Sequence, residues 1–246
     1  MNKVIESLKN HRSNRSFKKE YRLPKEELAD ILECARQAPS WMNGQHYSII
    51  VVEDQEKKEK IFELTGQKQI ATSAVFLLFC GNLSHVKVAA EIERKEIDFT
   101  DGYEAVVTAT TDASLAMQNT IIAAESLGYG TVCCGGIRGV AKEVEEMFDI
   151  PKGAFVFCGL SIGKLDLELT TERVKPRLPF EANVGFDKFP VTTKEQLLEY
   201  NATMEKFAEA RETKVWTDKM VSFHAAKPLE KALVDSLERQ GYISKK

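Results

Sequence analysis

The chain has 246 residues, of which 43% are hydrophobic and 29% are charged, an ordinary globular composition. At this length folding buries roughly 70–75% of the surface that the unfolded chain exposes, so a sizeable core needs no covalent cross-links. The formal net charge of -3 argues against a nucleic-acid-binding domain, but it does not exclude a small local anion site.

The cysteines and histidines do not predict a metal site or a disulfide framework. The cysteines are odd in number, no CxxC pair occurs, and the four histidines lie far apart in the sequence. The first 17 residues are amphipathic and polar, without the apolar core of a signal peptide. The weakly charged run 105–124 carries several uncharged polar residues besides Asp112, so it is too polar for a membrane span. We expect a soluble protein of a reducing compartment, the cytoplasm.

The first half of the chain alternates helical and strand patterns. Helical spacing of apolar residues over 26–38, and again over 57–65, predicts two helices. Two short apolar runs, 47–53 and 75–81, predict buried strands, the second with both faces covered. Mixed charges dominate from Leu83 to Glu104, which indicates either an exposed helix or a mobile lid.

The second half contains the most apolar helix of the chain. Residues 105–127 predict a long helix that is apolar on most sides, which is typical of a protein centre or a subunit interface. Gly128 and Gly130 supply its stop signal. A strand over 131–134, a short helix over 141–148 and a buried strand over 154–163 follow.

After Lys164 the sequence becomes less apolar. A proline-containing stretch leads to two helical patterns, roughly 194–211 and 217–240, with few apolar residues per turn. Such helices cannot form a core of their own, so we expect them to pack on the body or on another subunit. The economical interpretation is one α+β domain with a core of residues 1–164 and a C-terminal helical extension of residues 165–246.

Several common catalytic signatures are absent. The sequence has no GxxxxGK[ST] loop and no HExxH. The glycines at 128 and 130 lack the third glycine of a dinucleotide fingerprint, and they follow a helix and precede a strand, which disfavours a Rossmann fold.

Three polar segments remain as candidates for chemistry. Residues 11–16, HRSNRS, combine guanidinium, hydroxyl and imidazole groups that match phosphate oxygens. The alternative interpretation of this segment is a solvated charged turn. Residues 39–45, PSWMNGQ, form a loop whose side-chain amides can hydrogen-bond the edge of a polar heterocycle. The alternative is that these residues only stabilise an ordinary turn. Residues 175–179, KPRLP, present two cations on a segment that two prolines stiffen. The alternative interpretation is a surface connector.

Taken together, the segments resemble the nitroreductase superfamily, specifically its nitroreductase A / flavin reductase P group. HRSxRSF, APSxMNGQ, LTGQK, AAESLGYGTV with its following GGIR, and KPRLP occur in the family's order over nearly the whole chain. The resemblance implies an α+β, nitroreductase-like fold with a central, mostly antiparallel mixed β-sheet flanked by helices. It also implies an FMN-containing homodimer with swapped C-terminal extensions and two flavins at the subunit interface.

The resemblance also implies the flavin-binding residues. His11, Arg12, Ser13 and Arg15 would hold the phosphate, the ribityl chain and the pyrimidine edge, and Lys175 and Arg177 would complete this cationic site. The partner subunit would supply its own loop around Ser40. The implied FMN contacts are His11, Arg12, Ser13, Arg15, Ser40, Met42, Asn43, Gln67, Gly135, Gly136, Lys175 and Arg177, with Gln45 as a further candidate.

The implied reaction is ping-pong hydride transfer from NADPH, or from both NADPH and NADH, through FMN to nitroaromatics, quinones or free flavin. No catalytic side chain is required, because the cofactor carries the chemistry. Two alternatives stay open: a dedicated flavin reductase that supplies reduced FMN, and a flavin-binding protein without turnover. Candidates for the NADPH 2'-phosphate are Arg138, Arg211 and Lys214, while Glu212 would oppose it.

The sequence departs from the family at Cys133-Cys134, where relatives often carry larger or aliphatic residues. Adjacent thiols cannot bridge without strain, so we do not expect a catalytic disulfide. The pair would alter packing near the flavin or make the enzyme sensitive to oxidation.

Overall fold

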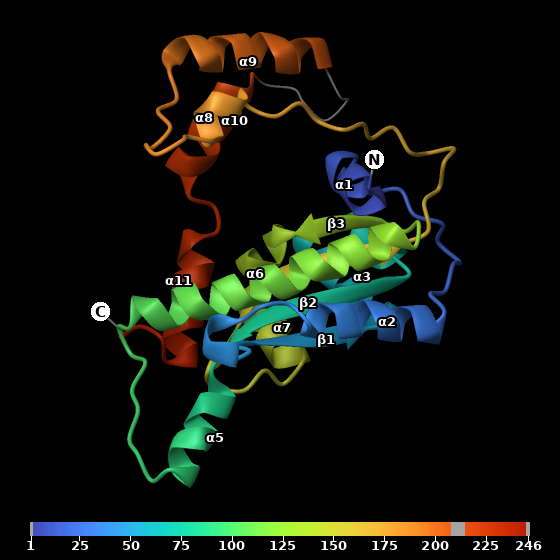
Figure 1. Cartoon of the computed structure of the whole chain (residues 1–246). Coiled ribbons are helices and arrows are strands. Elements are labelled where there is room, and N and C mark those ends of the chain that lie inside the picture. The colour runs from blue at the N-terminus through green and yellow to red at the C-terminus, as the bar shows by residue number, and fades with distance from the viewer. Residues whose placement is uncertain (1, 208–214, 245–246) are drawn as a thin grey trace. The chain divides into compact units, whose positions relative to one another are not determined.

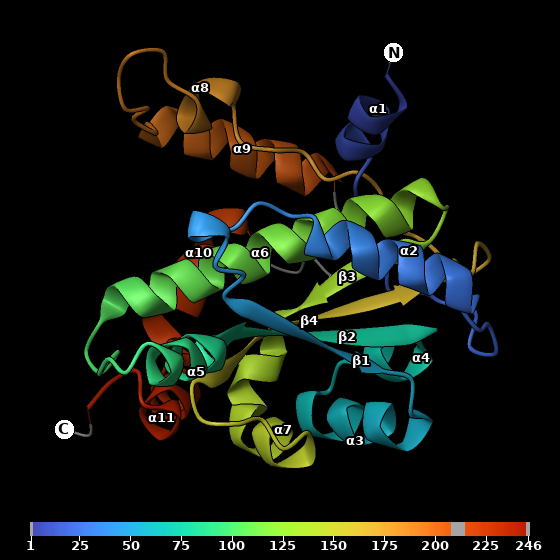
Figure 2. The same ribbon diagram turned by 60° about the horizontal axis from the view of Figure 1, so that its bottom comes forward.

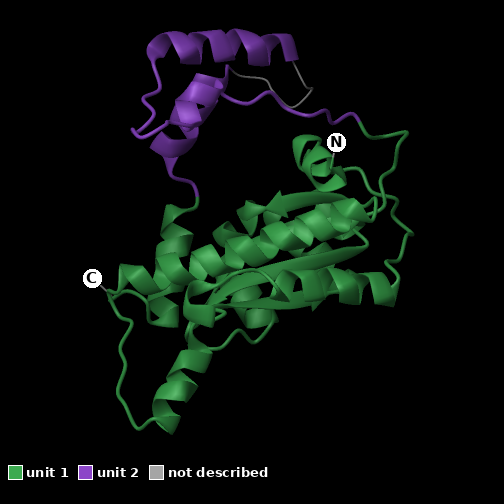
Figure 3. Cartoon of the chain, in the orientation of Figure 1, with its two compact units in different colours: residues 1–170, 229–246 green, residues 171–228 purple. Residues whose placement is uncertain are grey.

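The computed structural model describes residues 2–207 and 215–244. The chain divides into two compact units, one formed by residues 1–170 with 229–246 and the other by residues 171–228 (Figure 3). The first unit contains the β-sheet and most of the candidate site residues.

The sheet of the first unit has four strands in the order β1-β2-β4-β3, and each neighbouring pair is antiparallel. Outside these strands, Ser13 forms a parallel bridge with Thr131 at the β3 edge. The predicted α+β class with a mostly antiparallel sheet is therefore confirmed. The strands are β1 (Tyr47–Val52), β2 (Val75–Asn82), β3 (Gly130–Cys134) and β4 (Ala154–Gly163).

Helices cover both faces of this sheet, with α2 and α6 on one face and α3 and α7 on the other (Figures 1 and 2). The helices of the first unit are α1 (Lys3–Lys9), α2 (Lys25–Arg36), α3 (Gln55–Thr65), α4 (Lys68–Thr72), α5 (Ser84–Ile92), α6 (Tyr103–Ser126), α7 (Ala141–Met147) and α11 (Glu230–Gln240).

The alternation of side chains along β2 builds two separate cores. Leu77 and Phe79 join the cluster that contains Ile31 of α2 and residues of α6, whereas Phe76 and Leu78 join the cluster that contains Ile61 of α3. Every residue from Val75 to Gly81 is buried, as its unbroken apolar run predicts.

Two regions differ from the sequence pattern. The run 47–53 predicts a buried strand, but β1 (47–52) is an edge strand and most of its residues are only half-buried. In the ambiguous charged region, helix α5 ends at Ile92 and non-helical chain continues to Gly102 before α6 begins. No helix within the described residues is long and apolar enough to cross a membrane.

The second unit contains α8 (Phe180–Asn183), α9 (Lys194–Phe207) and α10 (Trp216–Ala226). The predicted helix over 217–240 is interrupted, because Lys227 adopts a left-handed conformation (φ 45°) and Pro228 cannot continue the helix. The chain then returns to the first unit as α11.

A buried carboxylate fastens α11 to α7. Glu145 on α7 is 6% exposed and accepts hydrogen bonds from the Ser236 hydroxyl and from Arg239 Nε and Nη2, the latter two at 3.1 and 3.0 Å. The C-terminal helix thus packs on its own chain.

Replacing Glu145 by Ala should lower the free energy of unfolding by about 2–3 kcal/mol, because Ser236 and Arg239 lose a charged acceptor in a buried position. The matched control is Glu146→Ala on the same helix. Glu146 is 68% exposed and pairs with Lys142 at 3.9 Å, so its loss should cost less than about 1 kcal/mol. Urea denaturation measures both, and equal effects would contradict the role of Glu145.

Candidate functional site

The basic N-terminal segment is fixed along the edge of β3. The backbone N–H of Asn14 donates to Thr131 O at 2.8 Å, next to the bridge between Ser13 and Thr131. Asn14 is buried, and its side-chain amide donates to Arg12 O at 3.1 Å. Residues 11–15 therefore have a defined backbone path in spite of their high charge.

Glu125, near the end of α6, holds this segment from a second direction. Its Oε1 lies 2.8 Å from His11 Nδ1 and accepts a hydrogen bond from the Thr131 hydroxyl at 2.6 Å. One carboxylate oxygen thereby links the N-terminal segment, α6 and β3, and fixes the orientation of the His11 ring.

The two arginines of the segment also contact its backbone. Arg12 Nη1 donates to Asn10 O at 3.4 Å, and Arg15 Nη1 donates to Ser13 O at 3.1 Å. Each guanidinium has further N–H donors, which suit an anionic ligand with several oxygens.

A second group of predicted residues meets at the end of β3. Gly66 ends α3 in a left-handed conformation (φ 69°), and Gln67 follows directly at the start of α4. A Cβ on Gly136 would lie 3.0 Å from Gln67 Oε1, so glycine is the residue that leaves this oxygen uncrowded.

Gln67 Oε1 is also a buried acceptor with no hydrogen-bond partner among the described residues. A buried polar atom without a partner is costly, which suggests that a ligand completes it. A heterocycle with an N–H edge, such as the flavin implied by the sequence, fits this acceptor and the cationic segment 11–15.

Arg138 lies directly behind the glycine pair. Its Nη1 donates to Phe157 O at 2.9 Å, and a Cβ on Gly135 would lie 3.3 Å from its Nη2. Phe157 is the extra residue of a β-bulge, where the register between β2 and β4 shifts. The bulge thus supplies the carbonyl that holds Arg138 beside the turn.

The loop from Ser40 to His46 is fixed by another carboxylate of α6. Asp112 is 1% exposed, and it accepts hydrogen bonds from the backbone N–H groups of Trp41 and His46, both at 3.0 Å. His46 Nδ1 lies 2.8 Å from the same carboxylate. A single buried side chain therefore holds both ends of the loop.

Three non-glycine residues of this loop, Met42, Asn43 and Gln45, have left-handed backbone angles (φ 50°, 56° and 52°). Asparagine tolerates this conformation, but methionine and glutamine do so at a cost of roughly 1–2 kcal/mol each. The Met42 side chain is nevertheless 87% exposed, so its own packing does not compensate. The contacts of Asp112 stabilise the strained loop, together with the hydrogen bond that the Gln45 N–H donates to the Ser40 hydroxyl at 3.2 Å.

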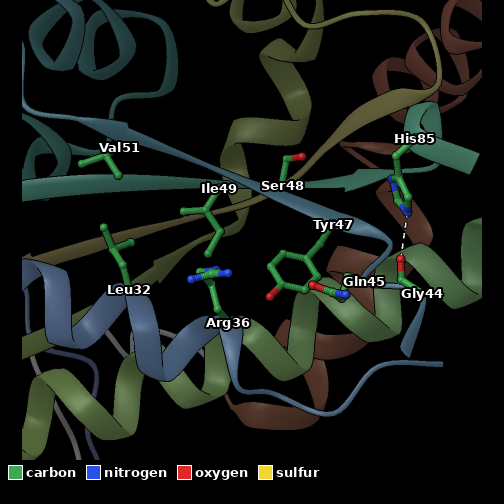
Figure 4. A pocket seen from close by; sticks show the side chains of 9 residues that line it. All are labelled: Leu32, Arg36, Gly44, Gln45, Tyr47, Ser48, Ile49, Val51 and His85. Carbon is green, nitrogen blue, oxygen red and sulfur yellow. Dashed lines mark hydrogen bonds between the residues drawn. The ribbon is translucent and has the colours of Figure 1, made fainter. Parts of the chain in front are cut away.

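A cavity of about 500 Å³ lies beside this loop, between the β1 edge and α2 (Figure 4). His85 contacts the loop there, with Nε2 2.8 Å from Gly44 O. Of the predicted flavin contacts, only Gln45 lines this cavity. The other lining residues are Leu32, Arg36, Gly44, Tyr47, Ser48, Ile49, Val51 and His85.

Asp112 and Glu125 are 13 positions apart on α6, which corresponds to about 20 Å along the helix axis. The structure therefore brings the predicted residues of the first unit together in three places. His11, Arg12, Ser13 and Arg15 lie at one end of α6, and Ser40, Met42, Asn43 and Gln45 lie toward the other. Gln67, Gly135 and Gly136 meet at the end of β3.

The remaining predicted residues belong to other parts of the chain. In the second unit, Arg177 Nη1 donates to Lys175 O at 3.1 Å, and Tyr200 donates to the intervening Pro176 O at 2.9 Å. Their flavin contacts stay predictions. Arg211 and Lys214, the candidates for the NADPH phosphate, lie outside the described residues together with Glu212.

Known proteins give the family context of this arrangement. The model of the nitroreductase family matches residues 8–164, and that of the nitroreductase family C-terminal domain matches residues 175–245. The chain belongs to the nitroreductase family. It is 37% identical to the FMN reductase [NAD(P)H] of Bacillus subtilis (strain 168), over 98% of both chains.

Solved structures agree with this membership. A structure of NfrA2 from B. megaterium is 33% identical with a TM-score of 0.91, covering 100% of both chains. Nitroreductase A from Vibrio parahaemolyticus RIMD 2210633 is 28% identical with a TM-score of 0.88, again over 100% of both chains. The expected nitroreductase-like fold is confirmed.

The sequence analysis missed the residues that position the site. Asp112 and Glu125 were not assigned a role, although Asp112 is the one charge in the run 105–124 and was visible as such. His46, which shares the Asp112 carboxylate, gave no signal of its own, because its partner lies 66 positions away.

Replacing Asp112 by Ala should destabilise the loop, because three partly buried donors lose their acceptor. We expect the free energy of unfolding to fall by about 3 kcal/mol, and chymotrypsin to cleave the native protein faster after the exposed Trp41. Glu104→Ala is the control, since Glu104 is an exposed acid on the same helix and should change stability by less than about 0.5 kcal/mol.

Unchanged cleavage of native Asp112→Ala protein would contradict this role of Asp112, even if the variant were less stable overall. Asp112→Asn retains one acceptor oxygen and the side-chain volume, so its cleavage rate should lie between those of the wild type and the Ala variant.

Proposed function

We propose that the chain is an FMN-dependent NAD(P)H oxidoreductase. The main observation in support of this function is Gln67 Oε1, a buried acceptor beside Gly136 that has no hydrogen-bond partner among the described residues. The chain is also a family member whose cationic segment 11–15 is fixed to β3. When bound, FMN supplies the redox chemistry, taking a hydride from NAD(P)H and passing electrons to an acceptor.

The residues of this chain bind and orient the cofactor. Arg12, Ser13 and Arg15 offer charge-assisted hydrogen bonds to phosphate and ring-edge oxygens. His11 keeps its place through Glu125, and Gln67 accepts a hydrogen bond from a ring N–H. The cations also stabilise the negative charge that reduction places on the ring, which raises the two-electron potential.

The glycine pair has a steric role. Gly135 and Gly136 present backbone without side chains, so a planar ring and a second planar reactant have room to stack. An open face of the flavin ring leaves room for electron acceptors of different shapes, such as nitroaromatics, quinones and free flavin. The similarity to a protein named FMN reductase [NAD(P)H] supports free FMN as one of them.

We further propose a homodimer in which each loop 40–45 contacts the flavin of the partner. The separation of the two groups of predicted residues along α6 supports this arrangement. Apolar side chains of the second unit, among them Phe186, Phe189 and Val191, are more than 70% exposed in the single chain and call for a covering surface. Sedimentation equilibrium should return the mass of two chains.

The cytoplasm is the proposed compartment. All five cysteines are free thiols, which suits a reducing environment.

Anaerobic mixing with NADH and NADPH in parallel tests the proposed reaction. The bound flavin should lose its absorbance with at least one of them and recover it on addition of FMN, nitrofurazone or a quinone. A protein that binds FMN but is not bleached by either nucleotide would instead be a flavin-binding protein without turnover. Relative rates with free FMN and the other acceptors separate a dedicated flavin reductase from a general one.

Replacing Arg15 by Ala should weaken FMN binding. A lost hydrogen bond to a charged group contributes about 1.5–3 kcal/mol, which corresponds to roughly 10- to 150-fold in Kd. Arg22→Ala is the matched control, because Arg22 is exposed and was not assigned to the flavin site. Equal Kd values for both variants, measured by fluorescence quenching of FMN, would remove Arg15 from the site.

A further inference from the structure

A smaller cavity of the first unit lies where the chain leaves β1 and enters β2. Its volume is about 270 Å³, and its walls come from the segment before α2, the first two turns of α3 and the residues that follow α4. None of the predicted flavin contacts lines it. Its charged lining residues are the cations Lys19, Arg22 and Lys58 and the carboxylates Glu20 and Glu59.

The ammonium group of Lys58 is the one deeply buried charge of this cavity. Lys58 is 3% exposed, and its Nζ donates a hydrogen bond to Ser73 O at 2.7 Å. An ammonium group has three N–H donors, so two of them have no acceptor among the described residues. Lys58 also forms no ion pair with a described carboxylate. A buried charge in this state is costly unless a ligand supplies the missing acceptors.

Two further cations line the same cavity from the segment before α2. Lys19 and Arg22 are exposed, and neither side chain hydrogen-bonds or forms an ion pair with a residue that the structure describes. Burial and then the charge of Arg22 lower the pKa of Lys58, whereas Glu53 and Glu59 raise it. The two cations therefore repel each other across the cavity, and an anion between them would turn this repulsion into attraction.

The carboxylates of the cavity do not take this place. Glu59 is exposed, and its Oε1 accepts a hydrogen bond from Gln55 Nε2 at 2.9 Å on the same helix. Glu20 is also exposed and is not paired with Lys58. The cations outnumber the carboxylates, and the charge that is most removed from water is a cation.

We propose that this cavity is a binding site for a phosphate group, either inorganic phosphate or a small phosphate monoester, held by Lys58, Arg22 and Lys19. A phosphate dianion has enough oxygens for the planar donors of an arginine and for two ammonium groups, whereas a carboxylate has only two. The cavity is smaller than the roughly 300–1,000 Å³ that is usual for larger ligands, which favours a small group. The site does not depend on the proposed redox function.

Calorimetric titration of the flavin-loaded protein with inorganic phosphate, at constant ionic strength, tests the site. One phosphate should bind per chain. Arg22→Ala removes charge-assisted hydrogen bonds and should raise the Kd at least about 10-fold, and Lys58→Met should do the same. Lys57→Ala is the matched control, because Lys57 lies on the same helix but places its Nζ over the Phe148 ring, 4.9 Å from the centroid. Its Kd should equal that of the wild type.

The absence of phosphate binding by the wild type, or a wild-type Kd in Arg22→Ala, would overturn the proposal. Arg22 and Lys19 are exposed, so Arg22→Ala and Lys19→Ala keep the test valid if Lys58→Met does not fold. Glycerol 3-phosphate is the second probe: tighter binding than inorganic phosphate identifies an ester as the ligand, and weaker binding identifies the free ion.

Flavin-free protein separates this site from the cationic segment 11–15. Phosphate bound in the cavity should be retained in Arg15→Ala and weakened in Arg22→Ala. The reverse result would assign the phosphate to the proposed flavin site and would contradict the cavity site. This comparison remains decisive even for a protein that binds no FMN, so the failure of either proposal is recognised by itself.

Discussion

Two carboxylates on one helix hold the N-terminal segment and the loop around Ser40 in place. Asp112 and Glu125 both lie on α6, and each accepts hydrogen bonds from a segment with little regular structure of its own. A carboxylate inside a protein is costly unless it is hydrogen-bonded, and a loop with left-handed residues is costly unless it is fixed. The same hydrogen bonds offset both costs, because the loop supplies the donors that the carboxylate needs and the carboxylate fixes the loop.

The sheet makes this arrangement possible by fixing α6 rigidly. β2 and β4 are buried on both faces, so α6 packs on one side while α3 and α7 occupy the other. The glycine turn follows β3 at the edge of the same sheet, and the bulge at Phe157 reaches it through Arg138. A displacement of α6 would therefore move the N-terminal segment and the loop around Ser40 together.

The parts that the sequence predicted correctly are those in which local pattern and burial agree. The apolar run of β2, the strand β4 and the helix α6 appear nearly at their predicted bounds. The edge position of β1 and the register that places Cys133 opposite Leu160 were not predicted, because both depend on strand order. The roles of Asp112 and Glu125 were missed because Trp41, His46 and His11, which they contact, lie 66 or more positions away along the chain.

The features that a single chain leaves incomplete are concentrated around the candidate site. Gln67 Oε1 has no partner among the described residues, and Met42 combines a strained backbone with an exposed side chain. Each feature lowers the stability of the chain, and neither improves its core. Such costs persist where a ligand or a partner compensates for them. The unsatisfied acceptor calls for a ligand with an N–H group, and the exposed loop calls for a neighbouring surface, which are the two things that a flavin shared between two subunits provides.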